Sequence, residues 1–326
     1  MTTSIEGRIL SAQSNNGRLS LCNQDLISVP ESVWTLSSPS SKLGWWERPV
    51  LISIDLSQNH LEDVEVPDLP DLQHANLAHN RIKVITISAL NLVSLNLSNN
   101  QLRGDRSSAC PSQDLTSRSQ SPAWNTSIPQ RSRTELSNLT QANISCNQLM
   151  EFTGPPSLKS LDLSRNRLRQ LPQLCSLILE LNLSSNQISD ISGIEVLDSL
   201  VRVDFSENQI KKIPEQIGNL SQLTMLNFRC NDLNDIPSEL GRIETLKHIY
   251  LSGNPLRRIR PSVWQKGTET LKQYLLDRMA PVEDFSYQNL KPTRSMLPAR
   301  FSKVKQARYP INARGNTSPP AFIAIA

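Results

Sequence analysis

The sequence predicts an α/β fold in which short parallel strands from successive turns of the chain stack into one sheet. Three observations predict it. An eleven-residue phrase recurs along the chain, aliphatic residues occupy its first, fourth, sixth and eleventh places, and asparagine occupies its ninth. Successive asparagines are 19 to 23 residues apart at every step but one, close to the roughly 20 to 29 residues of a leucine-rich repeat. We therefore expect a curved leucine-rich repeat solenoid with its parallel sheet on the concave face.

Ten such turns, or coils, can be placed in the chain. The first is degraded, with Gln24 where asparagine is expected. The other nine carry the ninth-place asparagine: Asn59, Asn80, Asn100, Asn147, Asn166, Asn186, Asn208, Asn231 and Asn254. One coil cannot bury its apolar side alone, so the aliphatic places are expected to form a core between stacked neighbours.

The asparagines are expected to form a buried ladder. Each follows a predicted strand, where its side-chain amide can satisfy backbone groups that a tight turn leaves without partners. A proline follows the fourteenth-place apolar residue in several coils, as at Pro214 and Pro237. Proline has a fixed φ and no backbone donor, so these positions mark where the chain has left the sheet.

Two inserts are expected within the solenoid, which spans residues 1–261. The segment near 37–49 contains a Trp45-Trp46 pair, which we expect to pack on the N-terminal end in preference to binding a ligand. The segment 104–133 is rich in Ser, Arg, Pro and Gln, and it predicts a flexible excursion from one coil. A decayed coil is the alternative, but trial frames lack apolar fourth and sixth places.

The repeat stops after Pro261. Apolar residues near helical spacing over 262–279 predict a C-terminal helix that caps the last coil. Residues 280–326 are rich in Pro, Ser and basic side chains, which predicts a disordered tail. The tail carries seven Lys or Arg against two acidic residues, whereas the whole chain has a net charge of +4. The basic charge therefore belongs to the tail, and no nucleic-acid partner is expected for the coils.

Three segments carry a resemblance to a known family: GRLSLCNQDLISVPESVW near the start, the Trp-Trp-Glu before the second coil, and NPLRRIRPSVWQKGTETLKQYLLDRM at the end of the repeats. Together they resemble the leucine-rich repeat-containing protein 40 family, over residues 15 to 60 and 155 to 279. The resemblance implies an intracellular repeat protein, and it implies no catalytic residues.

Catalytic and membrane motifs are missing from the sequence. It contains no phosphate-binding glycine loop, zinc-protease motif or nucleophile elbow, so we expect neither an enzyme nor a cofactor. The start lacks a basic segment followed by an apolar run, and no stretch reaches the roughly 18 apolar residues of a membrane span. Five scattered cysteines are interpreted as reduced thiols, which favours the cytosol or nucleus.

Two patterns resemble functional motifs, and we interpret both as structural. His60, His74 and His79 lie in adjacent coils, but no carboxylate or thiol completes a tetrahedral zinc site, so they are expected to be solvated imidazoles. Arg202-Val203-Asp204-Phe205 has the form of a docking motif for protein phosphatase 1. Val203 and Phe205 occupy the fourth and sixth places, however, so we expect them to be buried.

The variable third, fifth, seventh and eighth places of the inner face are the candidate binding surface. Its C-terminal half carries side-chain types that are enriched at interfaces, in the set Arg202, Met225, Arg229, His248 and Tyr250. We predict that these residues bind a protein partner and that the chain is an interaction scaffold; an ordinary solvated face is the alternative. A second functional hypothesis is a regulatory subunit of a signalling enzyme, either a phosphatase or a small GTPase.

Overall fold

A computed structural model of the chain describes residues 7–8, 16–35, 50–103 and 136–279. All of these lie in one compact unit, Met1–Pro281. The predicted inserts near 37–49 and 104–133 and the predicted tail 280–326 lie outside the described residues.

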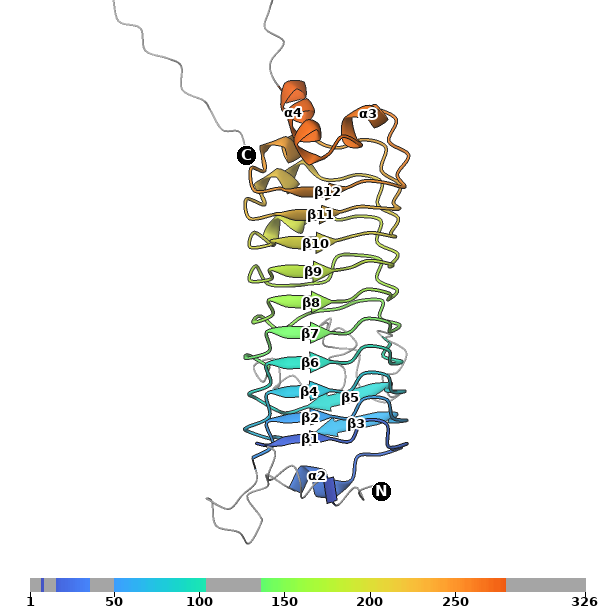
Figure 1. The fold of residues 1–326 in the computed structure, drawn as a ribbon, viewed down its shortest axis with the longest axis vertical. Coiled ribbons are helices and arrows are strands. Elements are labelled where there is room, and N and C mark those ends of the chain that lie inside the picture. The colour runs from blue at the N-terminus through green and yellow to red at the C-terminus, as the bar shows by residue number, and fades with distance from the viewer. Residues whose placement is uncertain (1–6, 9–15, 36–49, 104–135, 280–326) are drawn as a thin grey trace, which may run out of the picture. The chain divides into compact units, whose positions relative to one another are not determined.

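The described residues form one ten-stranded parallel sheet in which strands of successive coils pair in chain order, as Figure 1 shows. Each strand covers only the third to fifth places of its phrase, so Leu181 pairs in register with Leu161 and Val203. The strands are β1 (Arg18–Ser20), β2 (Ser53–Asp55), β4 (His74–Asn76), β6 (Ser94–Asn96), β7 (Gln141–Asn143), β8 (Ser160–Asp162), β9 (Glu180–Asn182), β10 (Arg202–Asp204), β11 (Met225–Asn227) and β12 (His248–Tyr250). The predicted leucine-rich repeat fold is confirmed, with one strand for each of the ten coils.

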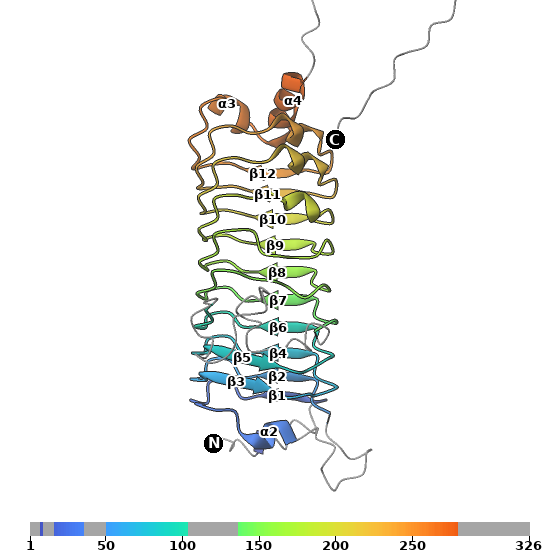
Figure 2. The same cartoon turned by 180° about the vertical axis from the view of Figure 1, so that it is seen from behind.

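The return side of the coils differs along the chain. In the second and third coils it contains β3 (Asp63–Val66) and β5 (Val84–Ile87), which pair in parallel, as seen from behind in Figure 2. Helix α2 (Glu31–Thr35) follows the first coil. Later coils return through short 3-10 helices, η4 (Ile194–Val196), η5 (Glu215–Asn219) and η6 (Ser238–Arg242). Pro214 and Pro237 precede η5 and η6, so the prolines do mark where the chain has left the sheet.

The aliphatic places form one continuous core. Leu181 is 2% exposed, and Val203 and Phe205 are fully buried, which confirms the prediction that the docking-motif residues belong to the core. Phe205 also stacks on Phe228 of the next coil, with 5.4 Å between ring centroids and 9° between ring planes. The motif is therefore unavailable to a partner while the coil is folded.

Two helices close the C-terminal end of the repeats, where the sequence predicts a single helix over 262–279. They are α3 (Pro261–Trp264) and α4 (Thr268–Met279). Gly267 separates them with a φ of 115°, a value that residues with a Cβ rarely adopt. Helix α4 buries Leu271 and Leu275, and Thr268 Oγ1 accepts a hydrogen bond of 3.2 Å from the backbone N–H of Ile249 in β12.

An ion pair also holds α4 against the coils. Arg278 makes two contacts with the Asp235 carboxylate, 3.0 Å from Nη1 to Oδ1 and 3.1 Å from Nη2 to Oδ2. Arg258 Nη1 lies 3.5 Å from the same carboxylate. Burial raises the pKa of Asp235, but hydrogen bonds from Arg278 and the backbone N–H of Ile236 and the positive charges nearby outweigh it, so the pKa lies below its ordinary value.

Candidate functional site

The turn after each strand is organised by the ninth-place asparagine. Asn186 is typical: its Oδ1 accepts a 3.0 Å hydrogen bond from the backbone N–H of Leu168 in the preceding coil. Its Nδ2 donates to the carbonyls of Leu163 at 3.0 Å, Leu183 at 3.0 Å and Ser184 at 3.2 Å. The predicted asparagine ladder is confirmed, and it joins each coil to the one before it.

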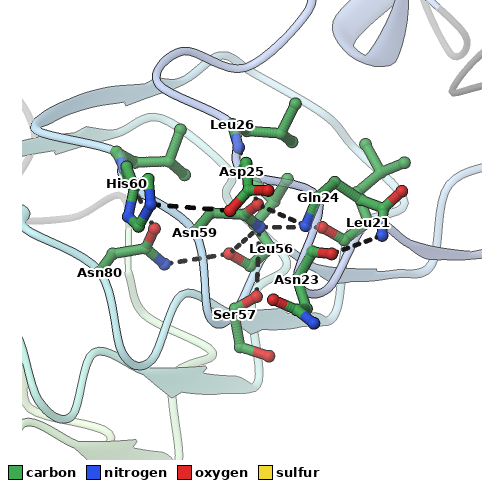
Figure 3. Close-up of polar contacts among 11 residues, drawn as sticks. Leu21, Asn23, Gln24, Asp25, Leu26, Leu56, Ser57, Asn59, His60 and Asn80 are labelled. Atoms are coloured by element: carbon green, nitrogen blue, oxygen red, sulfur yellow. Dashed lines mark hydrogen bonds and ion pairs between the residues drawn. The ribbon is translucent and has the colours of Figure 1, made fainter.

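Figure 3 shows the first step of this ladder. Asn59 accepts from the backbone N–H groups of Gln24 and Leu26, both at 3.0 Å, and donates at 2.8 Å to the carbonyl of Leu21. Gln24, which replaces asparagine in the first coil, donates only locally, to the carbonyls of Cys22 and Asn23. The ladder therefore begins with the second coil reaching back to the first.

The eighth place has a left-handed backbone, which sequence reasoning missed. Arg165, Ser185, Glu207 and Cys230 have φ between 54° and 56° there, and Gly253 has 78° in the last coil. Residues with a Cβ adopt this region at a cost of roughly 1 kcal/mol or more. The eighth-place residues thus form a turn as well as contributing to the surface, and the clearest signal of this in the sequence was Gly253.

Fifth-place residues are used within their own coils. In β10, Asp204 Oδ1 accepts from the backbone N–H of Ser206 at 2.8 Å and from its hydroxyl at 2.6 Å. Asn182 makes the same two bonds to Ser184, at 3.1 and 2.8 Å. These carboxylates and amides hold the turn, which leaves them less able to bind a partner. Tyr250 takes this place in the last coil, where its side chain is 42% exposed.

The five predicted partner-binding residues lie together on three adjacent coils. Arg202, Met225 and His248 begin β10, β11 and β12 and pair in register. The Tyr250 ring stacks on that of His248, with centroids 6.4 Å apart and planes 11° from parallel. Arg229 Nε donates to Ser252 Oγ in the next coil at 2.9 Å. All are exposed except Met225, which is half-buried.

A groove of about 370 Å³ adjoins this set at the start of β7 to β10, and sequence reasoning missed it. Arg202 belongs to both, and its Nη1 lies 3.2 Å from Glu180 Oε1. The groove is lined by Thr140, Gln141, Lys159, Ser160, Leu179, Glu180, Val201 and Arg202. Part of this lining comes from second places, which the repeat pattern does not mark as variable, so the sequence gave no signal for the groove.

The three histidines lie on two adjacent coils. No group of three or more His, Cys, Asp or Glu side chains within the described residues is placed to hold a metal ion. His60 Nε2 lies 3.7 Å from Asp25 Oδ1, an exposed contact visible in Figure 3. His74 begins β4, and His79 occupies the left-handed eighth place of the same coil.

Comparison with known proteins agrees with the fold. The family description "Leucine Rich Repeat" matches residues 91–112 and 157–177, and "Leucine Rich repeat" matches 175–197. Lumican of Coturnix japonica and lumican of Gallus gallus are each 34% identical to the chain over 226 residues, covering 64% of this chain and 59% of each relative. The chain thus spans less than two thirds of the length of these relatives.

Solved structures share the fold at low sequence identity. An internalin from Listeria monocytogenes gives a TM-score of 0.51 at 22% identity, over 77% of this chain and 66% of that one. The leucine-rich repeat domain of APL1 gives 0.54 at 22% identity, over 76% of this chain and 58% of that one. None of the helices in the described part of the chain combines the length and apolar character that crossing a bilayer demands.

Proposed function

We propose that this leucine-rich repeat protein is a non-enzymatic interaction scaffold that binds a protein partner on the sheet face of its last three coils. The observation that carries the proposal is the gathering of Arg202, Met225, Arg229, His248 and Tyr250 on adjacent, in-register coils. Arginine, tyrosine and methionine are enriched at protein interfaces. The leucine-rich repeat fold is commonly a protein-interaction module, which supports the same conclusion.

The arrangement of these side chains favours binding. Tyr250 is exposed because it replaces the asparagine or aspartate that holds the turn in the preceding coils. Stacking against His248 orders its ring before a partner arrives, so less side-chain entropy is lost on association. Met225 lies between Arg202 and His248 on the middle strand of the three and supplies an adaptable apolar contact at the centre.

The compartment and closer kinship form part of the same proposal. We place the chain in the cytosol or nucleus, supported by free thiols at Cys22, Cys146, Cys175 and Cys230. We also infer kinship with the leucine-rich repeat-containing protein 40 family from the Lys-Gly-Thr motif of this chain, in which Gly267 separates α3 from α4 and Thr268 accepts a hydrogen bond from β12.

Affinity capture with matched variants tests the proposal. The intact chain, a Tyr250→Ala/Arg229→Ala variant and a His74→Ala control are compared as baits, since His74 begins β4 as His248 begins β12. Because one hot spot contributes about 2 kcal/mol or more, the double variant is expected to bind the partner at least about thirtyfold more weakly. The control is expected to retain it. Retention by the double variant with loss in the control would move the binding surface to the N-terminal coils.

A scaffold and a regulatory subunit are separated by assaying the captured partner. If the partner is a phosphatase or small GTPase, its reaction rate is measured with and without the chain. A rate that changes supports regulation, whereas binding at an unchanged rate supports scaffolding alone.

A further inference from the structure

The groove at the start of β7 to β10 combines an apolar wall with polar side chains that make no hydrogen bond. Leu179 and Val201 occupy the second places of adjacent coils. Leu179 is 39% exposed, and Val201 is half-buried. Ile52 and Val93 are also aliphatic at this place, but the coils on either side of each carry no aliphatic residue there. Two neighbouring aliphatic side chains at the surface therefore distinguish this stretch of the edge.

The polar groups of the groove are largely free. Within the described residues, the side chains of Gln141, Lys159 and Ser160 make no hydrogen bond or ion pair, although all three line the groove. The asparagine and aspartate two residues after Gln141 and Ser160 are, by contrast, engaged in turns. An ammonium, an amide and a hydroxyl are thus available to a ligand.

The charge of the groove favours an anion. Lys159 and Arg202 oppose a single acidic residue, Glu180. The Arg202 and Glu180 side chains are 60% and 49% exposed, so their ion pair contributes little and exchanges readily. An incoming carboxylate gains both cations while displacing only this weak contact.

Backbone geometry decides how a ligand is held. The Leu179 carbonyl already accepts from the backbone N–H groups of Val201 at 2.8 Å and Arg202 at 3.0 Å, and the Lys159 carbonyl accepts likewise from the next coil. The groove therefore offers side chains and no free strand edge. Its volume of about 370 Å³ lies near the lower end of ligand sites, enough for one or two side chains.

We propose that this groove binds an extended acidic segment of the protein partner, with an aliphatic side chain against Leu179 and Val201 and the following carboxylate between Lys159 and Arg202. The inference rests on the proposed function, because it extends the partner-binding surface from Arg202 toward β7. It names the chemistry that the partner presents at that end: an aliphatic residue followed by Asp or Glu.

Short fluorescent peptides test the proposal on the intact chain by anisotropy. The probe Gly-Ser-Leu-Glu-Asp-Gly is compared with Gly-Ser-Ala-Glu-Asp-Gly and Gly-Ser-Leu-Lys-Lys-Gly. The first is expected to bind at least about fivefold more tightly than either control, the effect of one lost contact of about 1 kcal/mol. Equal binding of the alanine peptide would reveal a mere anion site and overturn the proposal, as would equal binding of the lysine peptide or no binding of the probe.

Matched variants locate the binding. Lys159→Glu is expected to weaken probe binding at least about fivefold, whereas Lys247→Glu, at the same place of a coil outside the groove, leaves it unchanged. Leu179→Ala weakens it, and Leu177→Ala, which removes a more exposed leucine outside the groove (54% against 39%), does not. Glu180→Gln strengthens it, because the competing carboxylate is removed. The opposite result in any of these pairs would contradict the assignment.

Failure of this inference is distinguishable from failure of the proposed function. Tyr250→Ala is expected to leave peptide binding unchanged, since Tyr250 does not line the groove. Loss of partner capture by Tyr250→Ala with no peptide binding would overturn the groove and leave the scaffold function standing. Peptide binding with intact partner capture by Tyr250→Ala would leave the groove standing and remove Tyr250 from the proposed partner-binding surface.

Discussion

Removing one asparagine of the ladder tests the register of the whole fold. Asn186→Ala deletes four hydrogen bonds, but the three carbonyls keep other partners: Leu163 accepts from Asn166, Leu183 from Asn208, and Ser184 from the N–H of Arg165. Only the Leu168 N–H, on a fully buried residue, loses its one partner. One stranded buried donor costs about 1 to 3 kcal/mol, which is the expected loss in the free energy of unfolding.

Asn186→Asp sharpens this prediction. One carboxylate oxygen can still accept from Leu168, but the other faces three carbonyls that the amide donates to. Only the protonated acid can donate there, so folding favours the proton and the variant is expected to gain stability as pH falls.

Urea denaturation of the parent and both variants at neutral and mildly acidic pH measures these effects. The parent's own pH dependence is subtracted. An Asn186→Ala variant within error of the parent, or an Asn186→Asp variant whose deficit is the same at both pH values, would refute the reasoning.

Three further outcomes are expected. Leu181→Ala, which empties a site between Leu161 and Val203, should lower the free energy of unfolding by about 2 to 5 kcal/mol in urea denaturation; a loss below about 1 kcal/mol would place the side chain outside the core. Arg165→Val puts a β-branched residue at a φ of 55° and should cost about 1 kcal/mol of the free energy of unfolding. Its melting temperature is therefore expected to lie below that of Arg167→Val, a nearby exposed control. Because the pKa of Asp235 is lowered in the folded chain, its stabilising effect is present above the ordinary value of 3.8 and is lost as pH falls through the folded value. Asp235→Asn should therefore destabilise the chain at neutral pH, and the deficit should shrink in acid denaturation; a deficit independent of pH would contradict the role of the carboxylate.

The sequence by itself determined the coils, their register and their core. Burial of Leu181, Val203 and Phe205 and the contacts of Asn186 follow from a pattern in which each residue meets its own counterpart in the next coil. Such contacts recur with the period of the sequence, so reading one coil predicts the others. For the same reason Val203 and Phe205 could be assigned to the core despite their resemblance to a docking motif.

Tertiary structure alone decided which surface groups are free. The left-handed φ at Arg165, the use of Asp204 in its own turn and the break at Gly267 depend on backbone geometry that the side-chain pattern does not carry. The pairing of β3 with β5 likewise concerns the return side, where the phrase imposes no residue types.

Part of the candidate site could likewise be predicted from the sequence, and part depended on the tertiary structure. Arg202, Met225 and His248 could be selected from sequence because their shared place puts them side by side on the sheet. The groove could not, since its lining combines unlike residues of four coils. Repetition fixes where each backbone position lies, whereas exposed side chains are placed by contacts that do not repeat.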